Sequence, residues 1–116
     1  MKLRYTPQAI ADLRELQTYI TDMLHNPAAA QRISKAILDA CGSLKRFPEL
    51  GVSIREKTGF ETDLRMLVCK NQIALYHIDS DGDTISIARI INARQDYMRI
   101  LFGNSEPAED KSNTSK

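Results

Sequence analysis

The sequence has no tryptophan, only two cysteines and almost no net charge. Its 116 residues carry 16 Lys and Arg against 15 Asp and Glu, a formal net charge of +1. Such a balance argues against a strongly basic protein that coats nucleic acid. No apolar run reaches the roughly 18–20 residues that a membrane span needs. Residues 1–5, MKLRY, also lack the apolar core of a signal peptide, so we expect a cytoplasmic protein.

Metal ligands and cofactor motifs are equally scarce. Cys41 and Cys69 lie far apart, with no C-x-x-C and no Cys/His pair at metal-ligand spacing. Reduced thiols are expected in a cytosolic chain. Residues 79–83 (DSDGD) superficially resemble a calcium loop, but Thr84 and Ile90 occupy the positions that require Gly and Glu. We therefore expect a turn there, no metal and no cofactor.

The chain does have enough apolar residues, 42%, to build one core in a single domain. Residues 2–5 alternate like a short strand. Thr6-Pro7 is a helix start signal, and apolar residues follow at helical spacing until Pro27 ends that helix. A second apolar stripe runs from about residue 30 to 47 and ends before Pro48 and Gly51. Two helices joined by a tight turn predict an antiparallel hairpin.

From about residue 60 the apolar period changes to that of strands. Residues 63–69, 72–78 and 84–91 predict a three-strand meander, and residues 93–102 a short helix. Residues 104–116 are polar and are expected to be disordered, which leaves a domain over 1–103. The predicted fold class is α+β: an N-terminal strand, then a helical hairpin packed on a small, mostly antiparallel sheet, then a short C-terminal helix. We expect the first strand to join the last meander strand, in a direction that stays open. Both faces of the middle strands are apolar, so both need a cover.

Several short motifs occur in a fixed order along this pattern. They are A-x-x-D-L (Ala9, Asp12, Leu13), F-P-x-x-G (Phe47, Pro48, Gly51), an arginine early in the first meander strand (Arg65), Y-x-I-D (Tyr76 to Asp79) and R-x-D (Arg94, Asp96). Over residues 1–102 this order resembles the RelE/ParE superfamily of bacterial type II toxins.

The resemblance implies one of two activities. RelE-like members are ribosome-dependent endonucleases that cut messenger RNA, whereas ParE-like members inhibit DNA gyrase by trapping it on cleaved DNA. In both branches a cognate antitoxin, ParD-like in the second, neutralises the toxin in a hetero-oligomer.

Residue chemistry favours the ParE branch. RNA cleavage needs a general base, a general acid and cations for the developing phosphorane charge. RelE-like enzymes supply these groups largely from lysine and arginine side chains on the meander. The resemblance places Leu64, Met66 and Ile73 at the corresponding positions here, and their side chains transfer no protons. We therefore expect a gyrase inhibitor without catalytic residues. Two alternatives stay open: a RelE-like endonuclease that uses Arg65, Arg94 and His77, and a non-toxic partner-binding or plasmid-maintenance module.

The candidate site residues each have a structural interpretation as well. His77 shares its predicted strand face with Ile73 and Leu75, and the sequence fixes no carboxylate beside it, which favours a structural role. Arg89 interrupts the apolar face of Ile85, Ile87 and Ile91, a costly position unless the charge is paired or serves a partner. The candidates for binding the target or the antitoxin are Arg65, Arg89, Arg94, Tyr97, Arg99 and Ile100.

Overall fold

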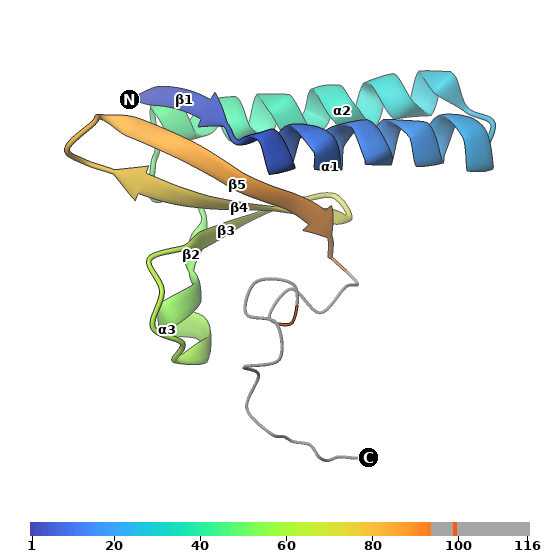
Figure 1. Cartoon of the computed structure of the whole chain (residues 1–116). Helices are drawn as coiled ribbons and strands as arrows, with labels where there is room; N and C mark the ends of the chain where they lie inside the picture. The colour runs from blue at the N-terminus through green and yellow to red at the C-terminus, as the bar shows by residue number, and fades with distance from the viewer. Residues whose placement is uncertain (94–98, 100–116) are drawn as a thin grey trace, which may run out of the picture.

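In the computed structural model, which describes residues 1–93 and 99, two long helices cover one face of a five-stranded sheet (Figure 1). The strands are β1 (Lys2–Tyr5), β2 (Val52–Ser53), β3 (Arg65–Cys69), β4 (Gln72–Asp79) and β5 (Thr84–Asn92). The helices are α1 (Pro7–Thr18), α2 (Pro27–Gly42) and the short α3 (Ile54–Thr58), with a π-helical turn η1 (Tyr19–Met23) after α1 and a 3-10 turn η2 (Ser43–Lys45) after α2. This arrangement confirms the α+β class.

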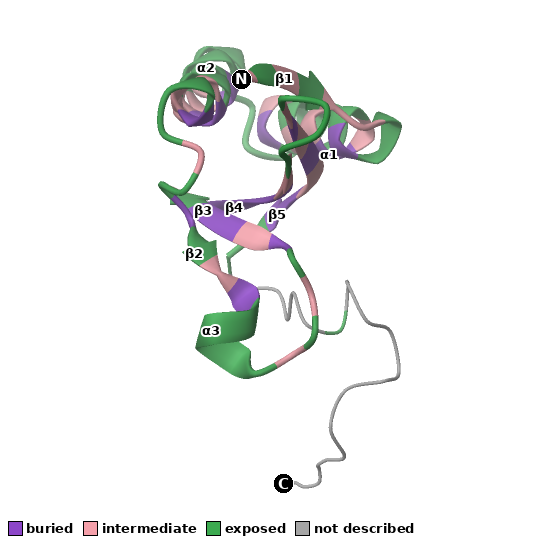
Figure 2. Ribbon diagram, turned by 90° about the vertical axis from the view of Figure 1, so that its left-hand side faces the viewer, coloured by how far each residue is buried: buried purple, intermediate pink, exposed green. Residues whose placement is uncertain are grey.

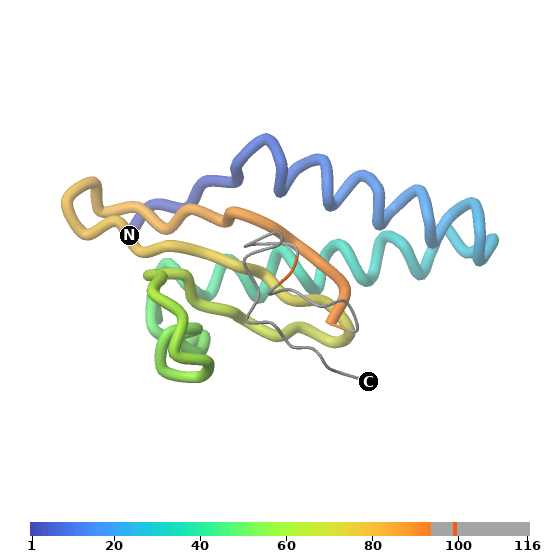
Figure 3. The backbone as a smooth tube through the Cα atoms, turned by 60° about the horizontal axis from the view of Figure 1, so that its bottom comes forward, coloured from blue at the N-terminus to red at the C-terminus, as the bar shows by residue number. Residues whose placement is uncertain are grey.

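The predicted hairpin is confirmed, with α1 and α2 side by side (Figure 3). Each helix begins with a side-chain cap followed by proline. The Thr6 hydroxyl accepts a hydrogen bond from the Ala9 N–H at 3.1 Å, and the Asn26 side chain accepts one from Ala29 at 3.1 Å. These caps satisfy backbone donors that the first helical turn leaves free.

The sheet order is β1-β5-β4-β3-β2, so the first strand does join the last meander strand. β1 runs parallel to β5, in a register that pairs Lys2 with Thr84 and Tyr5 with Ile87. All other pairs are antiparallel, which makes the sheet mixed. A parallel neighbour needs a crossover connection, which the hairpin supplies here.

A β-bulge in β5 overturns the simple alternation expected for that strand. Leu75 of β4 pairs with Arg89 and Tyr76 pairs with Ile87, which leaves Ala88 as the extra residue. Beyond the bulge, Ile90 joins Ile85 and Ile87 in the cluster under the helices, whereas Ile91 belongs to the cluster on the opposite face. The sequence reading that put Ile85, Ile87 and Ile91 on one face was therefore wrong at Ile91, because a bulge shifts the side-chain period by one residue.

Buried apolar residues form a cluster on each face of the sheet, as the sequence predicts, and most of β4 is buried (Figure 2). The helix side holds a cluster that includes Ile37, Leu44 and Tyr76. The other side holds a smaller cluster around Leu75, to which α3 contributes Ile54. The sequence analysis did not predict β2 and α3, which position Ile54 on this second face.

The predicted helix over 93–102 and the tail over 104–116 lie outside the described residues, apart from Ala93 and Arg99. Within the described part, no helix is both long and apolar enough to cross a membrane. The same residues contain no group of three His, Cys, Asp or Glu that could hold a metal ion. Both cysteines are free; Cys41 is buried and Cys69 is half-buried.

Candidate functional site

Arg89, one of the predicted binding residues, is paired inside the molecule. Its Nε lies 2.9 Å from Oδ2 of Asp12 on α1, and its Nη2 lies 3.2 Å from Oδ1. The same carboxylate accepts the Ile90 N–H at 2.9 Å and the Gln8 amide at 3.1 Å. The hydrogen bond to Asp12 raises the pKa of Arg89. The Asp12 carboxylate thus offsets the cost of placing the Arg89 charge on this strand. It also binds the backbone of β5 at Ile90, beyond the residues that pair with β1.

The Arg65 side chain binds the backbone of the loop that follows α2 and η2. Its Nη2 donates hydrogen bonds to the carbonyls of Gly51 at 2.7 Å and Glu49 at 3.3 Å. Its Nε is buried and has no hydrogen-bond partner. Arg65 pairs with Tyr76 across the sheet, and Tyr76 belongs to the cluster under the helices. The guanidinium therefore lies on the helix side of the sheet.

The Tyr76 side chain holds the same loop through hydrogen bonds. Its hydroxyl is buried, donates to the Pro48 carbonyl at 2.7 Å and accepts the Gly51 N–H at 2.9 Å. A Cβ at Gly51 would lie 2.6 Å from the Met66 carbonyl oxygen and 2.8 Å from the Tyr76 ring. Only glycine permits this approach, which explains the glycine of the F-P-x-x-G motif in physical terms.

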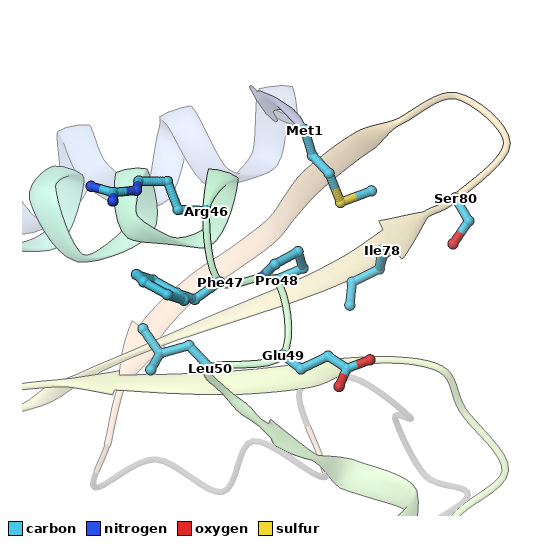
Figure 4. Close-up of a pocket in the computed structure, with 8 residues that line it drawn as sticks. All are labelled: Met1, Arg46, Phe47, Pro48, Glu49, Leu50, Ile78 and Ser80. Atoms are coloured by element: carbon cyan, nitrogen blue, oxygen red, sulfur yellow. The ribbon is translucent and has the colours of Figure 1, made fainter.

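The loop fixed in this way borders a hollow of about 600 Å³ (Figure 4). Phe47 and Leu50 extend to one side of the loop, whereas Pro48 lies toward Met1 and Ile78 (Figure 4). Phe47 and Leu50 are 58% and 54% exposed, and the Arg46 guanidinium lies 5.7 Å from the centre of the Phe47 ring. Apolar side chains so exposed on a fixed backbone form a candidate interaction surface.

His77 lies on the other face of the sheet and has a partner that the sequence analysis missed. Its Nδ1 is 2.8 Å from Oδ1 of Asp63, and both side chains are substantially exposed. The register of the β3–β4 hairpin is the signal that could have revealed Asp63. Because Arg65 pairs with Tyr76, the next position along the hairpin places His77 opposite Leu64, which directly follows Asp63 in the sequence. His77 alternates with Leu75, which belongs to the cluster away from the helices.

The structure thus separates Arg65 and His77, which a nuclease would need together. Arg65 lies on the helix side and His77 on the opposite side of the same sheet. Leu64, Met66 and Ile73, the positions where the resemblance implies that a nuclease would carry polar groups, are all buried in the apolar cluster on the His77 side.

The remaining candidates are at the C-terminal end of the domain. Arg94, Tyr97 and Ile100 lie outside the described residues. Arg99 is described and exposed.

Residues 3–97 match the family described as the ParE toxin of the type II toxin–antitoxin system parDE. The chain belongs to the ParE toxin family. The resemblance to the RelE/ParE superfamily expected from the sequence motifs is therefore confirmed.

Two solved structures share the fold of this ParE-family chain. The chromosomal ParDE toxin–antitoxin system from P. aeruginosa matches with a TM-score of 0.65 at 23% identity, covering 79% of this chain and 95% of the other. The toxin–antitoxin complex RelBE2 from Mycobacterium tuberculosis matches with a TM-score of 0.60 at 24% identity, covering 78% and 95%. No curated protein matches the ParE-family chain. One match is described as a ParDE system and the other as a RelBE2 complex, so the fold alone does not separate the two branches.

Proposed function

We propose that this ParE-family toxin inhibits DNA gyrase through protein contacts and has no active site of its own. The observation that carries the proposal is the placement of Arg65 and His77 on opposite faces of the sheet. Proton transfer and charge stabilisation act on one phosphate, so the groups that supply them must converge within hydrogen-bond reach of it. Two groups on opposite faces of a sheet cannot do so.

Arg89, the arginine of β5, is held by Asp12. A guanidinium in a two-bond contact with a buried carboxylate is already neutralised, which disfavours a role in stabilising a phosphorane. The apolar, buried residues Leu64, Met66 and Ile73 add no proton-transfer group. Family membership and site chemistry therefore support the same branch.

We further propose a cognate, ParD-like antitoxin as partner in a hetero-oligomer. The support is that the two similar structures named above are described as a toxin–antitoxin system and a toxin–antitoxin complex. Arg94, Tyr97, Arg99 and Ile100 stay predicted contact residues for gyrase or for this antitoxin.

One observation favours a second candidate function, a RelE-like endonuclease. The Asp63 carboxylate at Nδ1 of His77 holds the ring and leaves Nε2 available, an arrangement that suits a general base. Among the described residues, no lysine or arginine is hydrogen-bonded or ion-paired with Asp63 or His77. Within this part of the chain, the candidate function therefore lacks the cation that RNA cleavage needs.

The test uses purified chain in two parallel reactions, one with gyrase, ATP and supercoiled plasmid, the other with programmed ribosomes. We expect cleaved plasmid to accumulate while the messenger RNA stays intact, and His77→Ala to behave like the wild type. Codon-phased RNA cuts that disappear in His77→Ala would instead establish the endonuclease. Inactivity in both reactions would favour a non-toxic partner-binding or plasmid-maintenance module.

A further inference from the structure

The loop between η2 and β2 combines an exposed apolar surface with a fixed backbone. Phe47, Leu50 and Val52 are each more than half exposed within six consecutive residues. Large apolar side chains grouped on the surface in this way are typical of interaction sites.

The backbone beneath these side chains is held from three directions. Tyr76 binds Pro48 and Gly51, Arg65 binds Gly51 and Glu49, and the Leu50 N–H donates to the Phe47 carbonyl at 3.0 Å. A partner that binds here does not need to order the loop, which removes a large part of the entropic cost of association. Aromatic anchors on rigid elements are the residues that dominate interface energies.

The adjoining hollow has the size and lining of a site for an apolar side chain. Its volume is about 600 Å³, and Met1, Pro48 and Ile78 form an apolar wall opposite the side on which Phe47 and Leu50 project (Figure 4). A pocket within the usual range of a few hundred to about a thousand cubic ångströms admits one or two side chains of a protein partner.

The charges around the loop indicate the chemistry of that partner. Lys45, Arg46 and Arg65 form no ion pair with any described residue, and Glu49 is the one carboxylate within residues 45–52. Asp79 lies at the opposite rim of the hollow, between Ile78 and Ser80, so the positive charge is on the loop side. This excess of positive charge is complementary to an acidic surface. The matching occupant is a protein segment that presents an apolar side chain flanked by carboxylates.

A second exposed apolar group lies at the far end of the hairpin, where Tyr19, Met23 and Leu24 follow one another in and after η1. The hollow beside Tyr19, of about 480 Å³, is lined also by the charged side chains of Asp12, Glu15 and Arg89, and residues 19–24 include no lysine or arginine. These differences favour the loop as the docking surface and make Tyr19 a matched control, since it is 54% exposed.

We propose that the docking surface formed by residues 45–52 and the adjoining hollow binds an acidic, apolar segment of DNA gyrase. This inference rests on the proposed function, since a toxin without an active site must inhibit gyrase through a contact surface. Phe47 is the anchor, and Arg46, whose guanidinium lies over its ring, receives a carboxylate of gyrase.

The test measures binding of the purified full chain to the gyrase holoenzyme, together with plasmid cleavage. We expect Phe47→Ala to weaken binding about 30-fold, as for an interface anchor. Arg46→Glu is expected to weaken binding as well, and more strongly at low salt than at high salt. Tyr19→Ala is expected to bind like the wild type. Unchanged thermal unfolding of all three variants shows that the fold is intact.

The two possible failures are distinguishable. Wild-type inhibition of gyrase that persists undiminished in Phe47→Ala and Arg46→Glu would overturn the docking surface and leave the proposed function standing. A wild-type chain that neither binds nor inhibits gyrase would overturn the proposed function, and the docking surface with it.

Discussion

At the scale of single residues, Asp12 has the most partners among the buried polar side chains. It is 7% exposed and accepts hydrogen bonds from the guanidinium of Arg89, the backbone of Ile90 and the amide of Gln8. A buried carboxylate is tolerated only when such donors replace water. Removing it leaves a partly buried cation and a backbone N–H without acceptors.

We therefore expect Asp12→Ala to lower the free energy of unfolding by about 3 kcal/mol. Asp12→Asn should lose less, because its amide oxygen still accepts the Ile90 N–H. The control is Asp39→Ala, which removes only the exposed pair with Lys35 and should leave stability unchanged. Urea unfolding measures all three, and an equal effect of Asp12→Ala and Asp39→Ala would contradict the structural role of Asp12.

The pKa values of Cys41 and Tyr5, two side chains packed under the helices, predict how the stability of the fold depends on pH. Burial raises the pKa of the Cys41 thiol from its ordinary value of 9.0 to about 11, an effect that the nearby Tyr5 partly offsets. Burial also raises the pKa of Tyr5 above its ordinary value, with Cys41 adding to the effect. Both groups are neutral in the folded chain and release their protons more readily when it unfolds.

The sign follows from linkage: a raised pKa contributes stability that is present below the unfolded value and is lost as the pH rises toward the folded one. We expect this contribution to be constant from pH 7 to 8.5 and to fall between about pH 9 and 11, on the values for Cys41. Urea midpoints across this range test it. Cys41→Ala should flatten the fall, and a midpoint that rises with pH in both proteins would refute the assignment.

At the scale of elements, the F-P-x-x-G loop depends on close packing between Gly51 and β3. An added Cβ at Gly51 meets backbone of β3 at 2.6 Å, which a side-chain rotation cannot relieve. Gly42, at the end of α2, has open space around the equivalent position. The same substitution should therefore have opposite effects at the two sites.

We expect Gly51→Ala to destabilise the protein by about 2 kcal/mol through overpacking. Gly42→Ala should stabilise it by about 0.5–1 kcal/mol, because alanine restricts the unfolded chain and favours helix. Differential scanning calorimetry of both variants provides the comparison. Equal and small shifts at both positions would show that the loop backbone moves away from β3 without cost.

The elements also show why some features could be read from the sequence and others could not. Thr6, Asn26 and the prolines that follow them give local signals, so the hairpin was predicted correctly. The bulge at Ala88 has no local signal, because it depends on how β4 and β5 pair. Segments β2 and α3 are too short to show a periodic pattern, and tertiary contacts through Ile54 fix them.

The candidate site was predictable only residue by residue. The sequence named Arg65, His77 and Arg89, yet their partners lie 14 to 77 residues away. Distances of that kind follow from the register of the sheet and the packing of α1, which no motif encodes. The assignment of each residue to one face of the sheet therefore needed the structure.

At the scale of the whole molecule, one sheet separates two surfaces of different character. The helix side carries the fixed loop with Phe47 and Leu50 at its border, and the other side carries the Asp63–His77 pair above a buried apolar cluster. Within the described residues, the molecule thus has a fixed contact surface and no point where a base, an acid and a cation converge. These features support the proposed inhibition of gyrase by contact.

The most direct test of this proposed inhibition titrates the chain into a fixed amount of gyrase with ATP and supercoiled DNA and measures the yield of cleaved plasmid. An inhibitor that acts by contact forms a complex, so we predict that cleaved plasmid rises in proportion to the toxin and reaches a plateau once gyrase is saturated. His77→Ala should follow the same curve. Absence of cleaved plasmid at every ratio, with messenger RNA cut by substoichiometric toxin on ribosomes, would contradict the account.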